Sequence, residues 1–217
     1  VEDQISNTTL EFFGESKAIL SAKEDEDGIL PSAFDKTNGK FHVGQGAAFA
    51  VFESEKGLKS SGFEPMAWML GAYTAAENCS NPLGQTESGE GYVKAGQGAL
   101  DVAGLKNHQI ATVKTHGTGT LSNNVAEYTA LQKLLPDGFI ATSFKPTIGH
   151  TMGASGLLES ALLINNLQVT GKVPAIRNRT ESDDIFLSKA TRPKDNKFLS
   201  LAAGMGNIYS AAIFKAI

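Results

Sequence analysis

The sequence is poor in cysteine, since Cys79 is the only one among 217 residues. A single cysteine excludes a disulfide within the chain and is typical of a reducing compartment such as the cytoplasm. Long apolar runs are missing as well, because no stretch approaches the roughly 20 residues that a helix needs to cross a bilayer. No signal peptide is recognisable. We therefore expect a cytoplasmic protein with no membrane association.

Charge of either sign is scarce. Charged side chains make up 19% of the residues, and the formal net charge is −4. A weakly acidic chain offers no electrostatic attraction to nucleic acid or to an anionic membrane, so neither is an expected partner. Hydrophobic residues, by contrast, make up 41% of the chain, which is enough to bury the core of one ordinary domain.

Two histidines stand out by their position. His116 and His150 follow the β-type runs 110–113 and 139–142, and glycine flanks each of them. Because ligands of α/β sheets gather at the carboxyl ends of strands, we expect both imidazoles at one site. A neutral imidazole can donate a hydrogen bond to a carbonyl oxygen and stabilise negative charge that develops there. The plainer interpretation is that both are loop residues with satisfied hydrogen bonds.

Local patterns predict the order of the elements. We expect helices over 54–61, 92–103, 124–135 and 152–167, and further strands at 47–52, 65–76, 198–202 and 208–214. Asn124 would cap the third helix, and Glu127 would complete a capping box. From residue 63 onward the order is β-α-β-α-β-α-β-β, which favours a parallel or mixed sheet covered by helices.

The residues around the two histidines resemble signatures of the β-ketoacyl-acyl-carrier-protein synthases. The first, HGTGT with two asparagines and a glutamate after it, spans 116–127. The second, KPTIGHT with spaced glycines and a glutamate after it, spans 145–159. Two further stretches, 34–53 and the glycine-rich loop 204–206, are similar to family segments in the same order. The resemblance covers nearly the whole chain.

This resemblance implies a thiolase-like α/β fold, in which two similar halves pack into α-β-α-β-α layers. Residues 63–217 would form the C-terminal half, and residues 1–62 would be the tail of the N-terminal half. Most of the N-terminal half, with the family's cysteine nucleophile, would then lie outside this chain. Cys79 is no substitute, because it matches no family motif and no basic residue lies close in sequence to activate it.

The implied reaction is a decarboxylating Claisen condensation. A cysteine takes an acyl group from an acyl carrier protein, a malonyl thioester loses CO₂, and the resulting enolate attacks the acyl-cysteine. By resemblance, His116 and His150 would hydrogen-bond the malonyl thioester carbonyl. Lys145 would form a buried pair with Glu159 that orients the site. The alternatives are an exposed lysine at 145 and a helix-surface carboxylate at 159.

Other residues would take secondary roles. Thr118 and Thr120 would support the first histidine loop. Met205, between Gly204 and Gly206, stands where relatives have a phenylalanine that gates the acyl pocket, and its greater flexibility would change how the gate closes. A structural role in the turn is the alternative. We expect no cofactor and no metal, because the two histidines are isolated from other ligands.

The departures from the family pattern, among them Gln45 and Asn124, leave the pathway open between fatty-acid synthesis and polyketide or polyene synthesis. The expected partners are an acyl carrier protein carrying malonyl and acyl thioesters, and a second subunit in a homodimer or heterodimer. The second subunit could also be a chain that supplies the N-terminal half. The alternative function is a catalytically idle, chain-length-factor-type partner, but an idle subunit needs neither the two histidines nor Lys145.

Overall fold

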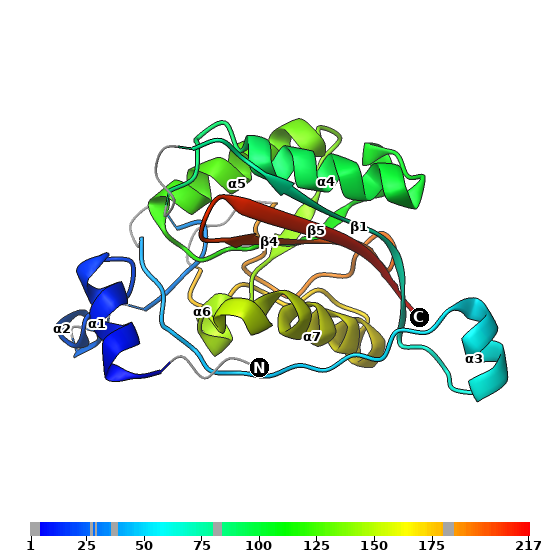
Figure 1. Ribbon diagram of the computed structural model, residues 1–217, viewed down its shortest axis with the longest axis horizontal. Coiled ribbons are helices and arrows are strands. Elements are labelled where there is room, and N and C mark those ends of the chain that lie inside the picture. Colours follow the sequence, from blue (N-terminus) through cyan, green and yellow to red (C-terminus); the bar gives the residue numbers. More distant parts are fainter. Residues whose placement is uncertain (1–4, 27, 29, 36–38, 80–83, 180–184) are drawn as a thin grey trace.

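One mixed sheet of five strands organises the described part of the chain (Figure 1). The computed structural model describes residues 5–26, 28, 30–35, 39–79, 84–179 and 185–217. The strand order is β1-β5-β4-β2-β3. β2 runs parallel to β3 and β4, whereas β5 is antiparallel to β4 and β1. The strands are β1 (Ala67–Ala76), β2 (Thr112–Lys114), β3 (Ile140–Thr142), β4 (Lys197–Gly204) and β5 (Ile208–Ala216).

Helices cover both faces of this sheet, with α4 and α5 on one side and α6 and α7 on the other (Figure 1). These four are α4 (Glu90–Ala103), α5 (Leu121–Leu134), α6 (Lys145–Ile148) and α7 (Ser155–Thr170). Short 3₁₀ turns, η1 (Asn107–Gln109) and η2 (Met152–Ala154), precede β2 and α7. Before the sheet come α1 (Asn7–Glu15), α2 (Ala22–Glu26) and α3 (Glu55–Ser61).

Strand alternation sends neighbouring side chains into two separate cores. In β4, Leu199 and Leu201 join the core under α4 and α5, whereas Phe198 joins the core under α7. Val113 of β2 belongs to the first core, so the next residue, Lys114, faces α7. A lysine in the middle of a covered sheet must find an anion on that face, because an isolated buried charge is costly.

The predicted order β-α-β-α-β-α-β-β is confirmed from β1 to β5. The helix expected over 54–61 is also confirmed as α3. Its N-cap is Ser54, whose hydroxyl accepts the Gly57 N–H at 3.1 Å, and its C-cap is Gly62 in the left-handed region. These ends were predictable because serine and glycine are favoured at caps for local reasons.

The capping role predicted for Asn124 is wrong. Helix α5 begins at Leu121 with Thr120 as its N-cap. The Asn124 side chain instead accepts the Phe34 N–H at 3.1 Å and donates to the Asp35 carbonyl at 3.3 Å. A contact with a segment 90 positions away in the sequence has replaced the local cap. The side-chain amide can make this contact because its oxygen accepts a hydrogen bond and its nitrogen donates one.

The strand predicted at 47–52 is wrong as well. The segment runs extended past α6 and α7 toward α3, but it forms no strand ladder with any described residue (Figure 1). Phe49 is 87% exposed and Val51 is 91% exposed. The local pattern of a buried strand is present, but a strand needs a neighbour to pair with, and the described chain supplies none here.

Candidate active site

The backbone of His116 is held between two charged side chains just after β2. Its N–H donates to Glu127 Oε1 at 2.6 Å, and the Gly117 N–H donates to Glu127 Oε2 at 2.9 Å. On the opposite side, Lys145 Nζ donates to the His116 carbonyl at 2.5 Å. Gly117 has φ +51°, and a Cβ there would clash with Ser143 Oγ. The loop therefore requires glycine directly after the histidine.

The backbone of His150 is fixed by the segment that precedes 47–52. The His150 N–H donates to the His42 carbonyl at 2.7 Å, and its carbonyl accepts the Gly44 N–H at 3.0 Å. Gly149 has φ +76°, and its backbone lies so close to Gly44 that a Cβ on either residue would clash. Two facing glycines thus let the segment 41–44 pair with the second histidine loop as a short parallel bridge.

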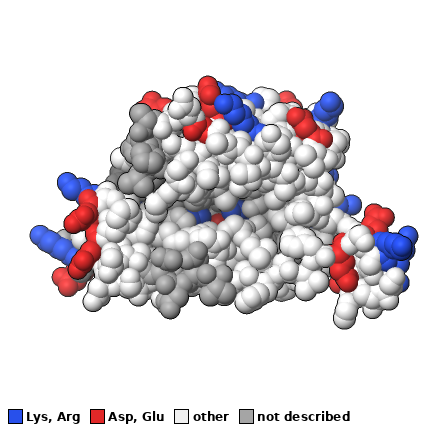
Figure 2. All heavy atoms as spheres, in the orientation of Figure 1, with Lys and Arg blue, Asp and Glu red and all other residues white. Residues whose placement is uncertain are grey.

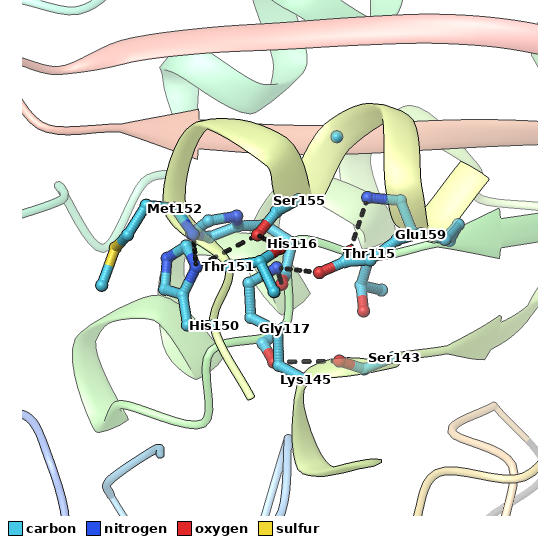
Figure 3. Close-up of polar contacts among 12 residues, drawn as sticks. Thr115, His116, Gly117, Ser143, Lys145, His150, Thr151, Met152, Ser155 and Glu159 are labelled. Atoms are coloured by element: carbon cyan, nitrogen blue, oxygen red, sulfur yellow. Dashed lines mark hydrogen bonds and ion pairs between the residues drawn. The ribbon is translucent and has the colours of Figure 1, made fainter. Parts of the chain in front are cut away.

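The ring of His150 has a defined tautomer. The Met152 N–H, which can only donate, lies 3.1 Å from His150 Nδ1, and Ser155 Oγ lies 3.2 Å from the same atom (Figure 3). Met152 has φ +46°, which is uncommon for a residue other than glycine. Because Nδ1 accepts, the proton of the neutral ring is on Nε2, so that nitrogen is a hydrogen-bond donor.

The two imidazoles lie together, as Figure 3 shows. Their ring centroids are 5.5 Å apart and their planes are 78° apart. The Phe41 ring covers His150 edge-on at 5.3 Å. The Nδ1 atom of His116 is buried and has no hydrogen-bond partner within the described residues. A buried unpaired polar atom costs about 1–3 kcal/mol, and in native proteins it marks strain, a catalytic role or an additional partner.

Behind the histidines, two buried lysines share one carboxylate. Glu159 Oε1 lies 2.7 Å from Lys145 Nζ, and Glu159 Oε2 lies 3.0 Å from Lys114 Nζ. Lys114 also donates to the Leu201 carbonyl at 2.7 Å. None of the three charged side chains is more than 1% exposed. Figure 2 shows the molecule in the orientation of Figure 1. The face in view has a hollow near its middle, and atoms of Lys or Arg and of Asp or Glu are visible at its floor.

The second buried carboxylate, Glu127, links the first histidine loop to the other helix layer. Asn123 Nδ2 donates to Glu127 Oε2 at 3.1 Å, and the Tyr92 hydroxyl donates to Asn123 Oδ1 at 2.7 Å. Tyr92 lies on α4, while Asn123 and Glu127 lie on α5. Because every link is buried, this chain of hydrogen bonds fixes the position of the loop amides relative to the helices.

Burial and nearby cations keep both imidazoles neutral. Burial lowers the pKa of His116 well below its ordinary value of 6.5, and Lys145, His150 and Lys114 lower it further. Burial likewise lowers the pKa of His150, with Lys145 and Lys114 adding to the effect. Burial opposes the ionisation of Glu159, but the two lysines hold its pKa below the ordinary value. Two neutral rings backed by ammonium groups can stabilise a developing oxyanion.

The described ranges contain no group of three or more His, Cys, Asp or Glu side chains that could hold a metal ion. No helix in the described ranges is long and apolar enough to span a bilayer.

The sequence of this chain is similar to that of known proteins. Residues 66–180 match the family model described as the β-ketoacyl synthase C-terminal domain, and this span contains both histidines, Lys145 and Glu159. The chain belongs to the β-ketoacyl synthase family. The family resemblance of the motifs is thereby confirmed.

Both the sequence and the structure comparisons find relatives of this chain. The tetracenomycin polyketide synthase ketoacyl synthase alpha subunit of Streptomyces glaucescens is 28% identical over 96% of this chain and 50% of its own length. A β-ketoacyl synthase from Burkholderia phymatum has a TM-score of 0.90 at 27% identity, covering 100% of this chain and 53% of its own. A ketosynthase solved with a type II polyketide acyl carrier protein has a TM-score of 0.91 at 19% identity, covering 100% of this chain and 54% of its own.

These comparisons confirm the thiolase-like fold of the chain. The chain spans about half the length of the curated relatives it matches.

The structure brings four predicted site residues together: His116, His150, Lys145 and Glu159. The predicted Lys145–Glu159 pair is confirmed. The alternative interpretation of Glu159 as a helix-surface carboxylate is wrong, because α7 turns this side chain toward the sheet, where it is fully buried. The catalytic roles of these residues stay predictions.

The residues predicted to have secondary roles lie in two places. Thr118 and Thr120 lie in the first histidine loop, with their hydroxyl oxygens 3.2 Å apart. Gly204 ends β4, and Met205 and Gly206 lie in the turn between β4 and β5, at the same end of the sheet as α6 (Figure 1). The Met205 side chain is about half exposed. The supporting role of the threonines and the gate role of the turn stay predictions.

Two features of the candidate site were missed in the sequence. Lys114 was given no role. A lysine directly after the β-type run 110–113, two positions before His116, was an available signal. Glu127 was interpreted as part of a capping box, whereas it accepts the amides of His116 and Gly117. Spacing along the chain could not show that contact, because it depends on the direction in which the loop returns to the helix.

Proposed function

We propose that this chain is the C-terminal part of a β-ketoacyl-acyl-carrier-protein synthase, which condenses malonyl and acyl thioesters in fatty-acid or polyketide synthesis. The observation that carries the proposal is the pair of imidazoles, neutral through burial, with ring centroids 5.5 Å apart. His150 Nε2 carries its proton because Met152 occupies Nδ1. A hydrogen-bond donor of this kind suits the oxygen of a thioester that becomes an enolate.

In the proposed reaction, the acyl group waits as a thioester on a cysteine. The carbon–carbon bond of the malonyl thioester breaks, CO₂ leaves, and the electron pair enters the thioester as an enolate. His116 and His150 donate hydrogen bonds to the enolate oxygen. The enolate carbon then attacks the acyl carbonyl, and the cysteine leaves as a thiolate, which yields the β-ketoacyl thioester. Lys145 acts through the His116 carbonyl and is therefore a positioning residue.

The proposed nucleophile lies outside this chain. Cys79 is partly exposed in the loop after β1, where its carbonyl accepts a hydrogen bond from Asn207 Nδ2 at 3.2 Å. We assign residues 1–62 to the tail of the N-terminal half and residues 63–217 to the C-terminal half. The relatives, whose length is about twice that of this chain, support this division.

Two surfaces of this chain support the proposal that a second half packs against it. The extended segment 47–53 exposes Phe49, Val51 and Phe52 to solvent. In addition, an open cavity of about 240 Å³ lies on the sheet face beside the first turns of α7. Apolar side chains in a patch of this kind are typical of an interface. Its lining includes Ala72, Tyr73, Leu157, Ala202, Ala212 and Phe214.

We expect the isolated chain of 217 residues to associate with itself or aggregate, because the exposed apolar side chains of segment 47–53 and the open cavity beside α7 need a partner. Size-exclusion chromatography with light scattering, together with binding of an apolar dye, measures this. Co-expression with the N-terminal half should restore a defined particle. A dye-negative monomer that unfolds cooperatively would contradict the proposed division.

The proposed partners follow from the reaction. An acyl carrier protein delivers the malonyl and acyl thioesters, and the synthase works as a homodimer or as a heterodimer with a related subunit. The ketosynthase structures with an acyl carrier protein and with a chain length factor support such partners by their fold similarity. We place the synthase in the cytoplasm, since a free cysteine is compatible with a reducing compartment.

The test is release of CO₂ from a malonyl-carrier thioester by the full-length protein. Release in the presence of an acyl thioester, with a β-ketoacyl product of matching mass, supports the synthase. A full-length protein that binds the carrier but releases no CO₂ and forms no acyl-enzyme would instead be an idle partner subunit.

A further inference from the structure

Lys114 occupies a position where stability alone would favour an apolar side chain. It lies on β2, between strands β3 and β4, and its side chain is fully buried against α7. A buried ion pair adds little stability compared with well-packed apolar residues of the same volume, because desolvation of the charges offsets their attraction. The lysine therefore calls for a role other than holding the sheet to the helix.

The contacts of Lys114 lead directly to the first histidine. Its ammonium binds Glu159 Oε2 at 3.0 Å, the other oxygen of Glu159 binds Lys145 at 2.7 Å, and Lys145 binds the His116 carbonyl at 2.5 Å. Lys114 also donates to the Leu201 carbonyl on β4, so its own ammonium is fixed to the sheet. Each link is buried, and each oxygen of Glu159 has one ammonium partner.

We propose that Lys114 is a positioning residue of the two-histidine site, which holds the Glu159 carboxylate and, through it, the Lys145 ammonium against the His116 carbonyl. This inference rests on the proposed function and deepens it. With Lys114 in place, Glu159 can offer Lys145 only one oxygen. Without Lys114, the carboxylate is able to turn both oxygens toward Lys145 and draw its ammonium away from His116, which shifts the imidazole.

Charge gives Lys114 a second effect at the same site. Its positive charge contributes to lowering the pKa of both His116 and His150, after the larger effects of burial and of Lys145. Removing this charge therefore raises the pKa of both rings toward the ordinary value. The titratable residues on the elements packed around the two histidines are Lys114 (β2), Lys145 (α6), Glu127 (α5), Glu159 (α7) and His42 (segment 41–44).

The experiment compares full-length wild type with Lys114→Met, which keeps the length of the side chain and removes its charge. Lys114→Gln is the second variant, since it retains a donor if the methionine variant does not fold. Lys94→Met on the surface of α4 is the matched control, because its side chain is 58% exposed. Decarboxylation kinetics against pH and titration of the ¹³C-labelled histidines by NMR are measured for each.

We expect Lys114→Met to lower kcat by about 10- to 100-fold with little change in KM, since a small displacement of a catalytic group has effects of this size. The acid limb of the pH profile and the two histidine titrations should move to higher pH. Lys94→Met should match wild type. Unchanged kcat and unchanged titrations in both Lys114 variants would overturn the proposal, as would a loss of rate that only follows the fraction of unfolded protein.

The two proposals fail separately in this experiment. A wild type that releases no CO₂ counts against the synthase reaction. The NMR titrations need no turnover, so histidine titrations that move in Lys114→Met but not in Lys94→Met still show that Lys114 acts on the two-histidine site.

Discussion

Replacing His150 by alanine in the full-length protein is expected to lower the rate of malonyl-carrier decarboxylation by about 100- to 1000-fold. The variant removes an Nε2–H donor whose tautomer is set by the Met152 N–H. Such a donor acts mainly when negative charge develops on the oxygen, so the loss should appear in kcat, with a smaller change in KM. Release of labelled CO₂ under single-turnover conditions measures the chemical step.

The matched control for this prediction is His108→Ala. His108 lies exposed on η1, so the variant makes the same chemical change outside the site. It should decarboxylate at the wild-type rate, and both variants should bind the carrier. Equal rates for His150→Ala and wild type would remove the catalytic role of this imidazole. An equal loss in His108→Ala would show that the assay reports stability rather than chemistry.

Replacing Glu159 by alanine should destabilise the protein by about 3–5 kcal/mol, which is the usual cost of breaking a buried ion pair by removing one partner. The loss is large because Glu159 neutralises two buried ammonium groups, Lys114 and Lys145. Once the carboxylate is gone, both cations remain in the core with only carbonyl partners. Urea unfolding of the full-length protein, with the midpoint compared at equal slope, measures the change.

The control for the stability prediction is Glu90→Ala on α4. Glu90 pairs with Lys94 at 3.7 Å, and both side chains are more than half exposed. An exposed pair contributes little, so this variant should change the free energy of unfolding by less than about 0.5 kcal/mol. If Glu159→Ala unfolds at the same urea concentration as Glu90→Ala, then Glu159 does not hold the two lysines in the folded protein.

Much of the fold was predictable because its signals are local. The caps at Ser54 and Gly62 and the order of strands and helices from β1 onward depend on residues within one turn or one strand. The failure at 47–52 has the opposite origin. Residues 47–52 have the local pattern of a buried strand, but pairing needs a neighbouring strand, and the described chain contains none for them.

In the candidate site, too, some residues were predictable from local sequence and others were not. His116, His150 and Lys145 were predictable from their motifs, and their convergence follows from strands whose carboxyl ends meet at one edge of the sheet. Lys114 and the role of Glu127 were not predictable from spacing. Lys114 reaches Glu159 across 45 positions, and Glu127 accepts loop amides that only the path of the chain brings to it.

By itself, the sequence determined the element order, the family and the two histidines, because these are carried by local propensity and by short motifs. The tertiary structure alone decided which nitrogen of His150 carries the proton, which carboxylate holds the first histidine loop, and that two lysines share Glu159. The physical reason is that hydrogen bonds and buried charges depend on direction and distance in space. Those quantities arise only when distant segments of the chain pack against one another.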